Sequence, residues 1–146
     1  MNQNRYSIFD RSIEQNGLKK AAGEEGLGII CFSPLAQGLL TGKYNNGIPE
    51  GSRAARSTGF LQQSQVTPER VEAVKKLAVI AEERGQSIAQ MALAWVLADE
   101  RVTSCIIGTS SVAQLESNLA ALDHLTFSEE EMERINNIIN TPLLWF

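Results

Sequence analysis

Two short apolar runs, separated by polar and helical segments, organise this sequence. Residues 28–33 (GIICFS) and residues 103–108 (TSCIIG) are apolar without the polar alternation of a half-exposed strand. A short, continuous and β-branched run is typical of a strand that is buried on both faces, as in a parallel sheet. Pro34 ends the first run, because proline cannot donate to a β-ladder. The pattern therefore predicts two buried parallel strands.

Helical periodicity and capping residues fill much of the rest of the chain. A short helix is expected over residues 18–25, and the polar residues 1–16 are expected to be irregular. Two helices begin at Thr67-Pro68 and at Ser87, and the first of them ends at Gly85. Residues that can cap a helix N-terminus precede four predicted helices: Thr67, Ser87, Ser111 and Ser128.

The predicted order is helix, strand, long loop, two helices, strand, helix, helix. The two strands with their helical crossover form a βαβ unit, which is nearly always right-handed. Two strands that are apolar on both faces cannot bury those faces or pair both edges within this chain. The sequence therefore predicts an α/β fold in which residues 1–146, with no separate domains, form part of a larger sheet or barrel.

Composition excludes several classes of function. No apolar run approaches the ~20 residues of a membrane helix, and the N-terminus lacks the apolar region of a secretory signal. A net charge of −4 argues against general nucleic-acid binding. Cys31 and Cys105 are expected to be buried, reduced thiols of a cytoplasmic protein, not a disulfide or a metal pair. With His124 as the single histidine, no metal site is predicted.

Residues 41–66 are rich in glycine and predicted to form a long loop, and such loops are usually functional or disordered. Lys43, Arg53 and Arg56 outnumber the single acidic residue Glu50 there. A positive loop on an acidic protein is a candidate anion site. The alternative is a solvated loop with incidental charges.

Three segments resemble a known family. Residues 32–44 (FSPLAQGLLTGKY) resemble the loop after the seventh barrel strand of aldo-keto reductases, and residues 107–118 (IGTSSVAQLESN) resemble the end of the eighth strand and its helix. Between them, residues 85–95 resemble the seventh barrel helix. The resemblance covers essentially the whole chain and is strongest to the branch with the potassium-channel β-subunits and the bacterial glyceraldehyde-3-phosphate reductases.

The resemblance implies the C-terminal portion of a (β/α)8 TIM barrel, with strands seven and eight and their helices, incomplete as a barrel. The family reduces carbonyl compounds with an Asp, Tyr, Lys and His tetrad on the first four strands, which have no counterpart here. Neither Tyr6 nor Tyr44 lies in the motif of the acid tyrosine. No catalytic residue is therefore predicted, and this chain alone is expected to be inactive, because reduction needs a proton donor beside the developing alkoxide.

The resemblance also implies part of an NADP(H)-binding site. The residues that match the family's cofactor contacts are Gln3, Phe32, Ser33, Pro34, Leu35, Ala36, Gln37, Lys43, Arg53, Gly108, Ser110, Gln114 and Asn118. Gln3 matches a side chain near the nicotinamide, and residues 32–37 match the stretch at the ribose and pyrophosphate. Lys43 and Arg53 match basic contacts to the phosphates. The other four match the pocket for the 2′-phosphate and adenine.

Side-chain chemistry independently suits several of these positions. Gln114 and Asn118 are four residues apart, so they share a helix face and can present two amides to one base. The segment at Ser110 begins a helix, where free N–H groups attract phosphate. Arg53 can chelate a phosphate in bidentate fashion, whereas Lys43 would act as a point charge.

The sequence leaves two other functions open. One is a non-enzymatic nucleotide-binding or interaction module that associates through its open strand edges with another copy or a complementing chain. The other is an unrelated barrel hydrolase that uses the phosphate site for a sugar phosphate. For the reductase, the expected partner is a small-molecule carbonyl substrate, with no nucleic acid and no membrane.

Overall fold

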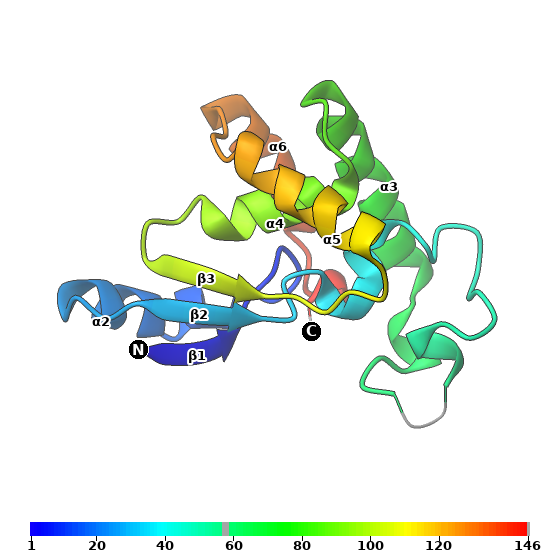
Figure 1. The fold of residues 1–146 in the computed structure, drawn as a ribbon, viewed down its shortest axis with the longest axis horizontal. Helices are drawn as coiled ribbons and strands as arrows, with labels where there is room; N and C mark the ends of the chain where they lie inside the picture. The colour runs from blue at the N-terminus through cyan, green and yellow to red at the C-terminus, as the bar shows by residue number, and fades with distance from the viewer. Residues whose placement is uncertain (57–58, 146) are drawn as a thin grey trace.

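Three parallel strands lie side by side in chain order: β1 (Asn2–Arg5), β2 (Ile29–Phe32) and β3 (Val102–Ile106) (Figure 1). The computed structural model describes residues 1–56 and 59–145. Arg5 pairs with Phe32, which in turn pairs with Ile106. The sheet is therefore an open α/β arrangement whose carboxyl ends meet at one edge.

Strand β1 corrects the prediction that residues 1–16 are irregular. Its side chains are polar and give no apolar signal, but its backbone pairs with that of β2 over the whole strand. The next residues turn inward, and Tyr6, Phe9 and Ile13 are buried in the core. Consecutive strands usually lie next to each other in such sheets. β1 is therefore an additional strand that pairs beside the first of the two predicted strands.

The predicted helices are confirmed. They are α2 (Leu18–Glu24), α3 (Pro68–Glu83), α4 (Ile88–Leu97), α5 (Val112–Leu119) and α6 (Glu129–Ile139), and a further short helix, α1 (Ser12–Gln15), follows β1. The side chains of Thr67, Ser87, Ser111 and Ser128 each accept the expected backbone N–H. Local capping chemistry therefore sets where these helices begin.

The predicted long loop joins β2 to α3 and extends away from the sheet in Figure 1. It contains only short 3-10 turns, at Ala36–Thr41, Arg53–Ala55 and Gln63–Gln65. Residues 57–58 of this loop lie outside the described residues. The loop follows β2 directly, so it starts at the carboxyl edge of the sheet.

Helices cover one face of the sheet. Ile29 and Cys31 on that face are 0% exposed, whereas Ile106 on the other face is 47% exposed. We call this second face the open face; strand alternation places on it Gln3, Arg5, Ile30, Phe32, Ser104 and Ile106. None of the described residues covers the open face, which is clearest at β3, as expected for strands that cannot bury both faces within this chain.

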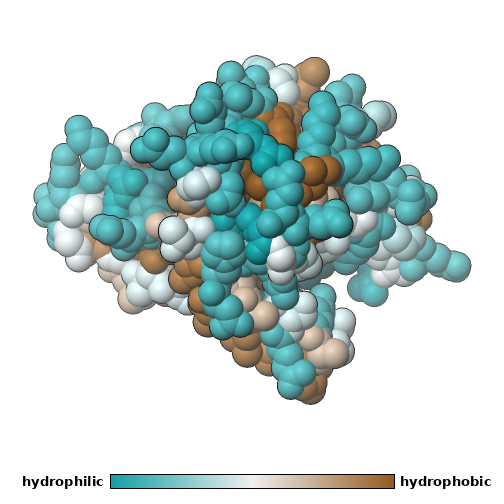
Figure 2. Space-filling model, turned by 90° about the horizontal axis from the view of Figure 1, so that it is seen from above, coloured by the Kyte–Doolittle hydropathy of each residue, from teal (hydrophilic) through white to brown (hydrophobic). Residues whose placement is uncertain are grey.

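Apolar side chains also remain exposed away from the sheet. Figure 2 shows a largely hydrophilic surface with hydrophobic residues gathered along one edge. On α5 and the turn after it, Val112, Leu115, Leu119 and Leu122 are between 39% and 72% exposed. No helix in residues 1–56 and 59–145 has the length and apolar character needed to cross a membrane.

The cysteines are free thiols, as predicted. Cys31 is buried and Cys105, its register partner on β3, is half-buried. Burial raises the pKa of Cys31 to about 11 and that of Cys105 to about 12. Both groups therefore stay protonated at neutral pH.

Candidate functional site

A cleft of about 200 Å³ lies where the carboxyl ends of β2 and β3 meet the β2–α3 loop. We call it the cofactor cleft, after the prediction. The predicted residues that line it are Phe32, Ser33, Pro34, Leu35, Gln37, Lys43, Arg53, Gly108 and Gln114. They come from three segments that are far apart in the sequence. The fold therefore brings most of the predicted set to one place, while Gln3, Ala36, Ser110 and Asn118 do not line the cleft.

The segment after β2 has an unusual backbone. Ser33, Ala36 and Gln37 have φ values of 54°, 50° and 61°, in the left-handed region that non-glycine residues rarely adopt. Gln37 Nε2 donates to Ser33 Oγ at 2.8 Å, and Arg53 Nη1 donates to Gln37 Oε1 at 3.2 Å. These bonds connect the far loop to the strand end. Strain held in this way is common at ligand sites.

Two exposed cations flank the cleft, and glycines make room for them. A Cβ on Gly38, whose φ is 99°, would lie 2.8 Å from Lys43 Cε. A Cβ on Gly108 would lie 3.9 Å from Arg53 Nη2. Arg53 therefore reaches from the loop to the segment after β3. The two side chains place positive charge on both sides of a space that a phosphate group can enter.

The N-terminus of α5 forms the third wall. Ser111 caps the helix by accepting the N–H of Gln114 at 3.1 Å. The N–H of Ser110 is not among the free donors, because it donates to Gln114 Oε1 at 2.8 Å. The N–H groups of Val112 and Ala113 have no partner among the residues that the structure describes. The helix thus still offers donors to an anion, one turn further along.

Asn118 and Gln3 lie outside the cleft lining. Asn118 is 7% exposed, and its Nδ2 has no hydrogen-bond partner within residues 1–56 and 59–145. A buried amide donor without a partner is unfavourable by about 1–3 kcal/mol, so an external acceptor would stabilise it. Gln3 is exposed on the open face of β1. Because Asn118 Nδ2 is buried and Gln3 lies away from the cleft lining, the contacts predicted for these two residues stay predictions.

Sequence reasoning missed four residues of this cleft: Gly38, Thr41, Ile106 and Ile107. Each lies next to predicted residues in the chain, so the available signal was proximity along the sequence. Ile106 ends β3 on the open face, beside Phe32 in the register. Its exposure in the cleft follows from strand pairing, which a single sequence does not give.

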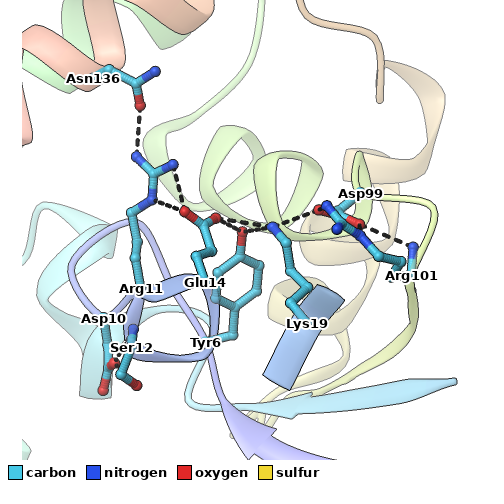
Figure 3. Close-up of polar contacts among 9 residues, drawn as sticks. All are labelled: Tyr6, Asp10, Arg11, Ser12, Glu14, Lys19, Asp99, Arg101 and Asn136. Carbon is cyan, nitrogen blue, oxygen red and sulfur yellow. Dashed lines mark hydrogen bonds and ion pairs between the residues drawn. The ribbon is translucent and has the colours of Figure 1, made fainter. Parts of the chain in front are cut away.

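A second concentration of polar groups lies elsewhere, on the helix-covered side of the sheet (Figure 3). We call it the polar cluster: Tyr6, Glu14, Lys19, Asp99 and Arg101. Lys19 Nζ lies 3.0 Å from both Tyr6 Oη and Glu14 Oε1, and 2.5 Å from Asp99 Oδ2. Tyr6 also donates to Glu14, and Arg101 Nε donates to Asp99 at 2.9 Å.

The polar cluster contains a tyrosine, a lysine and an aspartate, but its electrostatics oppose proton donation. Burial, the hydrogen bond to Glu14 and the nearby negative charges raise the pKa of Tyr6 far above its ordinary value. Burial also raises the pKa of Asp99, but bonds from Arg101 and Lys19 outweigh it and leave the pKa well below the ordinary value. The Tyr6 ring packs 5.1 Å from that of Trp95 on α4. Each charge here has a partner, which is typical of a structural network.

Comparison with known proteins decides the family. Residues 1–140 match the model of the aldo/keto reductase family. The chain belongs to the aldo/keto reductase family. It is 46% identical over 142 residues to an L-glyceraldehyde 3-phosphate reductase of Escherichia coli O157:H7, covering 95% of this chain and 41% of that protein.

Two further aldo/keto reductase comparisons agree. A voltage-gated potassium channel subunit beta assigned in Schizosaccharomyces pombe is 36% identical over 97% of this chain and 42% of its own length. The crystal structure of the thermostable aldo-keto reductase Tm1743 with the inhibitor epalrestat matches with a TM-score of 0.65 at 26% identity, covering 93% of this chain and 38% of that one. The chain thus spans about two fifths of the length of the relatives that it matches.

Proposed function

We propose that residues 1–146 form the cofactor-holding part of a single domain of an NADP(H)-dependent oxidoreductase, which reduces aldehydes or ketones to alcohols. The observation that carries this proposal is the cofactor cleft, where the end of β2, the long loop and the N-terminal part of α5 converge. Family membership supports an oxidoreductase. The free thiols suit a reducing, cytoplasmic setting.

The donor chemistry of the cleft fits a dinucleotide phosphate. Arg53 and Lys43 would hold phosphate oxygens, with the fork of the guanidinium giving orientation and the ammonium giving charge. The free N–H groups at the start of α5 and the unpartnered amide of Asn118 suit the adenosine end. Phe32 and Gln3 share the open face and suit the nicotinamide end.

In the proposed enzyme, this chain binds the cofactor, and a part outside this chain supplies the proton donor. A bound nicotinamide supplies the hydride. The residues of this chain would bind and orient the dinucleotide, and Phe32 and Leu35 would exclude water beside it. We infer that the proton donor comes from outside this chain, because Tyr6, bound in the polar cluster, is unsuited to that role.

The test is titration of NADPH, NADP+ and NADH into the purified chain. We expect weak binding, because one side of a pocket lacks the preorganisation of the whole. Binding should favour NADPH over NADH, since the 2′-phosphate adds charge-assisted bonds. Arg53→Met should weaken NADPH binding by about tenfold, the loss of one such bond. No turnover of small aldehydes is expected.

Arg56→Met is the matched control, because Arg56 is an exposed arginine of the same loop that does not line the cofactor cleft. If Arg53→Met and Arg56→Met weaken binding equally, the effect is one of general charge and the cleft assignment fails. Reductase activity from the chain alone would contradict the inference that the proton donor comes from outside it.

A second candidate function is an interaction module that pairs its open sheet face and edges with another chain. The exposed side chains of the open face and of α5 favour it. Light scattering separates the two: a monomer that binds NADPH supports the oxidoreductase part, whereas an oligomer without nucleotide affinity supports the module.

A further inference from the structure

A smaller pocket of about 60 Å³ lies beside the cofactor cleft, at the carboxyl ends of β1 and β2. Ser33 and Gln37 line both spaces, so the two lie next to each other. The remaining walls are Arg5 at the end of β1, Ser7 and Asp10 after it, Ala36, and Phe60 and Gln65 of the long loop. We call this space the Arg5 pocket. None of its features is needed for the cofactor contacts proposed above.

Arg5 enters this pocket with its hydrogen-bonding capacity unused. Its side chain is 49% exposed, and its guanidinium lies 5.8 Å from the centre of the Phe32 ring. The atom Nη1 lies 3.9 Å from Asp10 Oδ2, which is too far for a hydrogen bond. Within the described ranges the guanidinium makes no hydrogen bond. Its five N–H donors therefore remain available to a ligand.

Asp10 lines the same pocket and lies near Arg5 without forming a hydrogen bond to it. The carboxylate is 8% exposed, and Oδ1 accepts from Ser12 Oγ at 2.8 Å and from Ser12 N at 3.3 Å. These bonds fix the Asp10 side chain. The long ion pair then orients the guanidinium within the pocket that both residues line.

Two further donors line the same space. Ser33 Oγ accepts from Gln37 Nε2, so the hydroxyl proton of Ser33 remains to be donated. Gln65 Oε1 accepts the N–H of Gln62 at 2.8 Å, which leaves Gln65 Nε2 without a partner in the described part of the chain. Phe60, 90% exposed, supplies an apolar wall. The pocket thus holds one guanidinium, one carboxylate 3.9 Å from it and two neutral donors. Because the guanidinium keeps its N–H donors unused beside that carboxylate, it can still form charge-assisted bonds to one anionic group.

We propose that the Arg5 pocket binds the anionic group of a small aldehyde substrate, a phosphate or a carboxylate, and that Arg5 is a specificity-determining residue. This inference rests on the proposed function, because the adjacent cleft must hold the cofactor for the pocket to face the reacting carbonyl. The pocket sits at the end of β1 and β2, beside Phe32 at the predicted nicotinamide end. A carbonyl compound anchored here by its charge would lie next to that end.

The test titrates three non-reacting probes into the full chain: glycerol 3-phosphate, glycerate and neutral glycerol. We expect at least one of the two anions to bind and glycerol not to bind. Arg5→Met should weaken the binding of that anion about tenfold or more, since charge-assisted bonds are lost. Arg5→Lys should give a smaller loss, because it keeps the charge and loses the fork. The melting temperature of each variant checks that it folds.

Arg56→Met is the matched control and should leave anion binding within about twofold of wild type. Arg53→Met is a comparison variant, because Arg53 lines the adjacent cofactor cleft. Binding of the phosphate probe alone, or of the carboxylate probe alone, supports the pocket and identifies the group. Loss on Arg53→Met in place of Arg5→Met would put the anion in the cofactor cleft and overturn the proposal. Equal binding of glycerol, or binding of neither anion, would overturn it as well.

NADP+ titration of the same samples separates this proposal from the one on which it rests. Anion binding that depends on Arg5, without NADP+ binding, would overturn the proposed function and leave an anion pocket. NADP+ binding without anion binding that depends on Arg5 would overturn the pocket alone.

Discussion

The cofactor cleft and the polar cluster contain similar side chains but differ in how those side chains are partnered. In the polar cluster, Lys19 contacts Tyr6, Glu14 and Asp99, and its side chain is 9% exposed. In the cleft, Lys43 is exposed and forms no ion pair among the described residues, and its ammonium lies 5.7 Å from the centre of the Tyr44 ring. Satisfied charges stabilise a fold, whereas unpaired charges are free to bind a ligand.

Backbone geometry follows the same division. The segment after β2, which contributes to the cleft, contains three non-glycine residues with positive φ: Ser33, Ala36 and Gln37. Among the described residues, no non-glycine residue of the polar cluster has such a value. Strained backbone and hydrogen-bond donors without a partner therefore occur in the same region of the fold, the cofactor cleft. The two regions should therefore respond in opposite ways to substitution: the cluster in stability, the cleft in affinity.

The largest effect is expected from breaking the polar cluster. Lys19→Met leaves Glu14 and Asp99 without their shared cation in a partly buried space, which should lower the free energy of unfolding by about 3 kcal/mol. Urea unfolding followed by circular dichroism measures this. Lys20→Met is the neighbouring control: its side chain is 79% exposed, and it should change stability by less than about 0.5 kcal/mol. Equal effects of the two substitutions would show that the cluster has no special role.

A substitution at Gly38 should affect both stability and affinity. Gly38→Ala places a Cβ in the left-handed region and against Lys43, whereas Gly17→Ala meets the same backbone penalty in open space. Each should lower stability by about 1 kcal/mol. Only Gly38→Ala should also weaken NADP+ binding, because Lys43 must move. Paired denaturation and nucleotide titrations measure both effects, and an equal affinity for the two variants would contradict the role given to Lys43.

The smallest effect is a pH dependence. Because the folded state lowers the pKa of Asp99 below its unfolded value, its ionisation contributes stability above a pH of about 4. That contribution is lost as the pH falls through the folded pKa. Glu14, whose pKa is also lowered in the folded state, acts in the same direction. Unfolding curves between about pH 5 and 2 should show a shallower decline for Asp99→Asn than for wild type. A parallel decline would exclude this contribution.

Local signals in the sequence predicted most of the fold. The apolar run of β2 and the caps at Thr67, Ser87 and Ser128 depend on neighbouring residues alone, so a single sequence contains them. Strand β1 has no such signal, because Asn2 to Arg5 are polar and pair through their backbone. The apolar run of β3 indicates two faces suited to burial, but it does not indicate which of them the helices of this chain cover.

The candidate site was predictable mainly by resemblance. Matching motifs named Ser33, Arg53 and Gly108, and the fold places all three on one cleft. The Arg5 pocket had no motif. It depends on the alternation of β1, the position of Asp10 and the return of the long loop at Gln65, which are all tertiary facts. The bond between Ser110 and Gln114 likewise depends on side-chain geometry that spacing alone does not fix.

The strands of the sheet pair in chain order, with β1 and β3 as its two borders. In such a sequential arrangement each strand pairs only with its neighbours, so separating one group of strands from another requires no unthreading of the chain. A domain of this design can in principle be reassembled from two separately synthesised polypeptides that pair along both borders. For the proposed oxidoreductase, recovery of carbonyl reduction would report that docking.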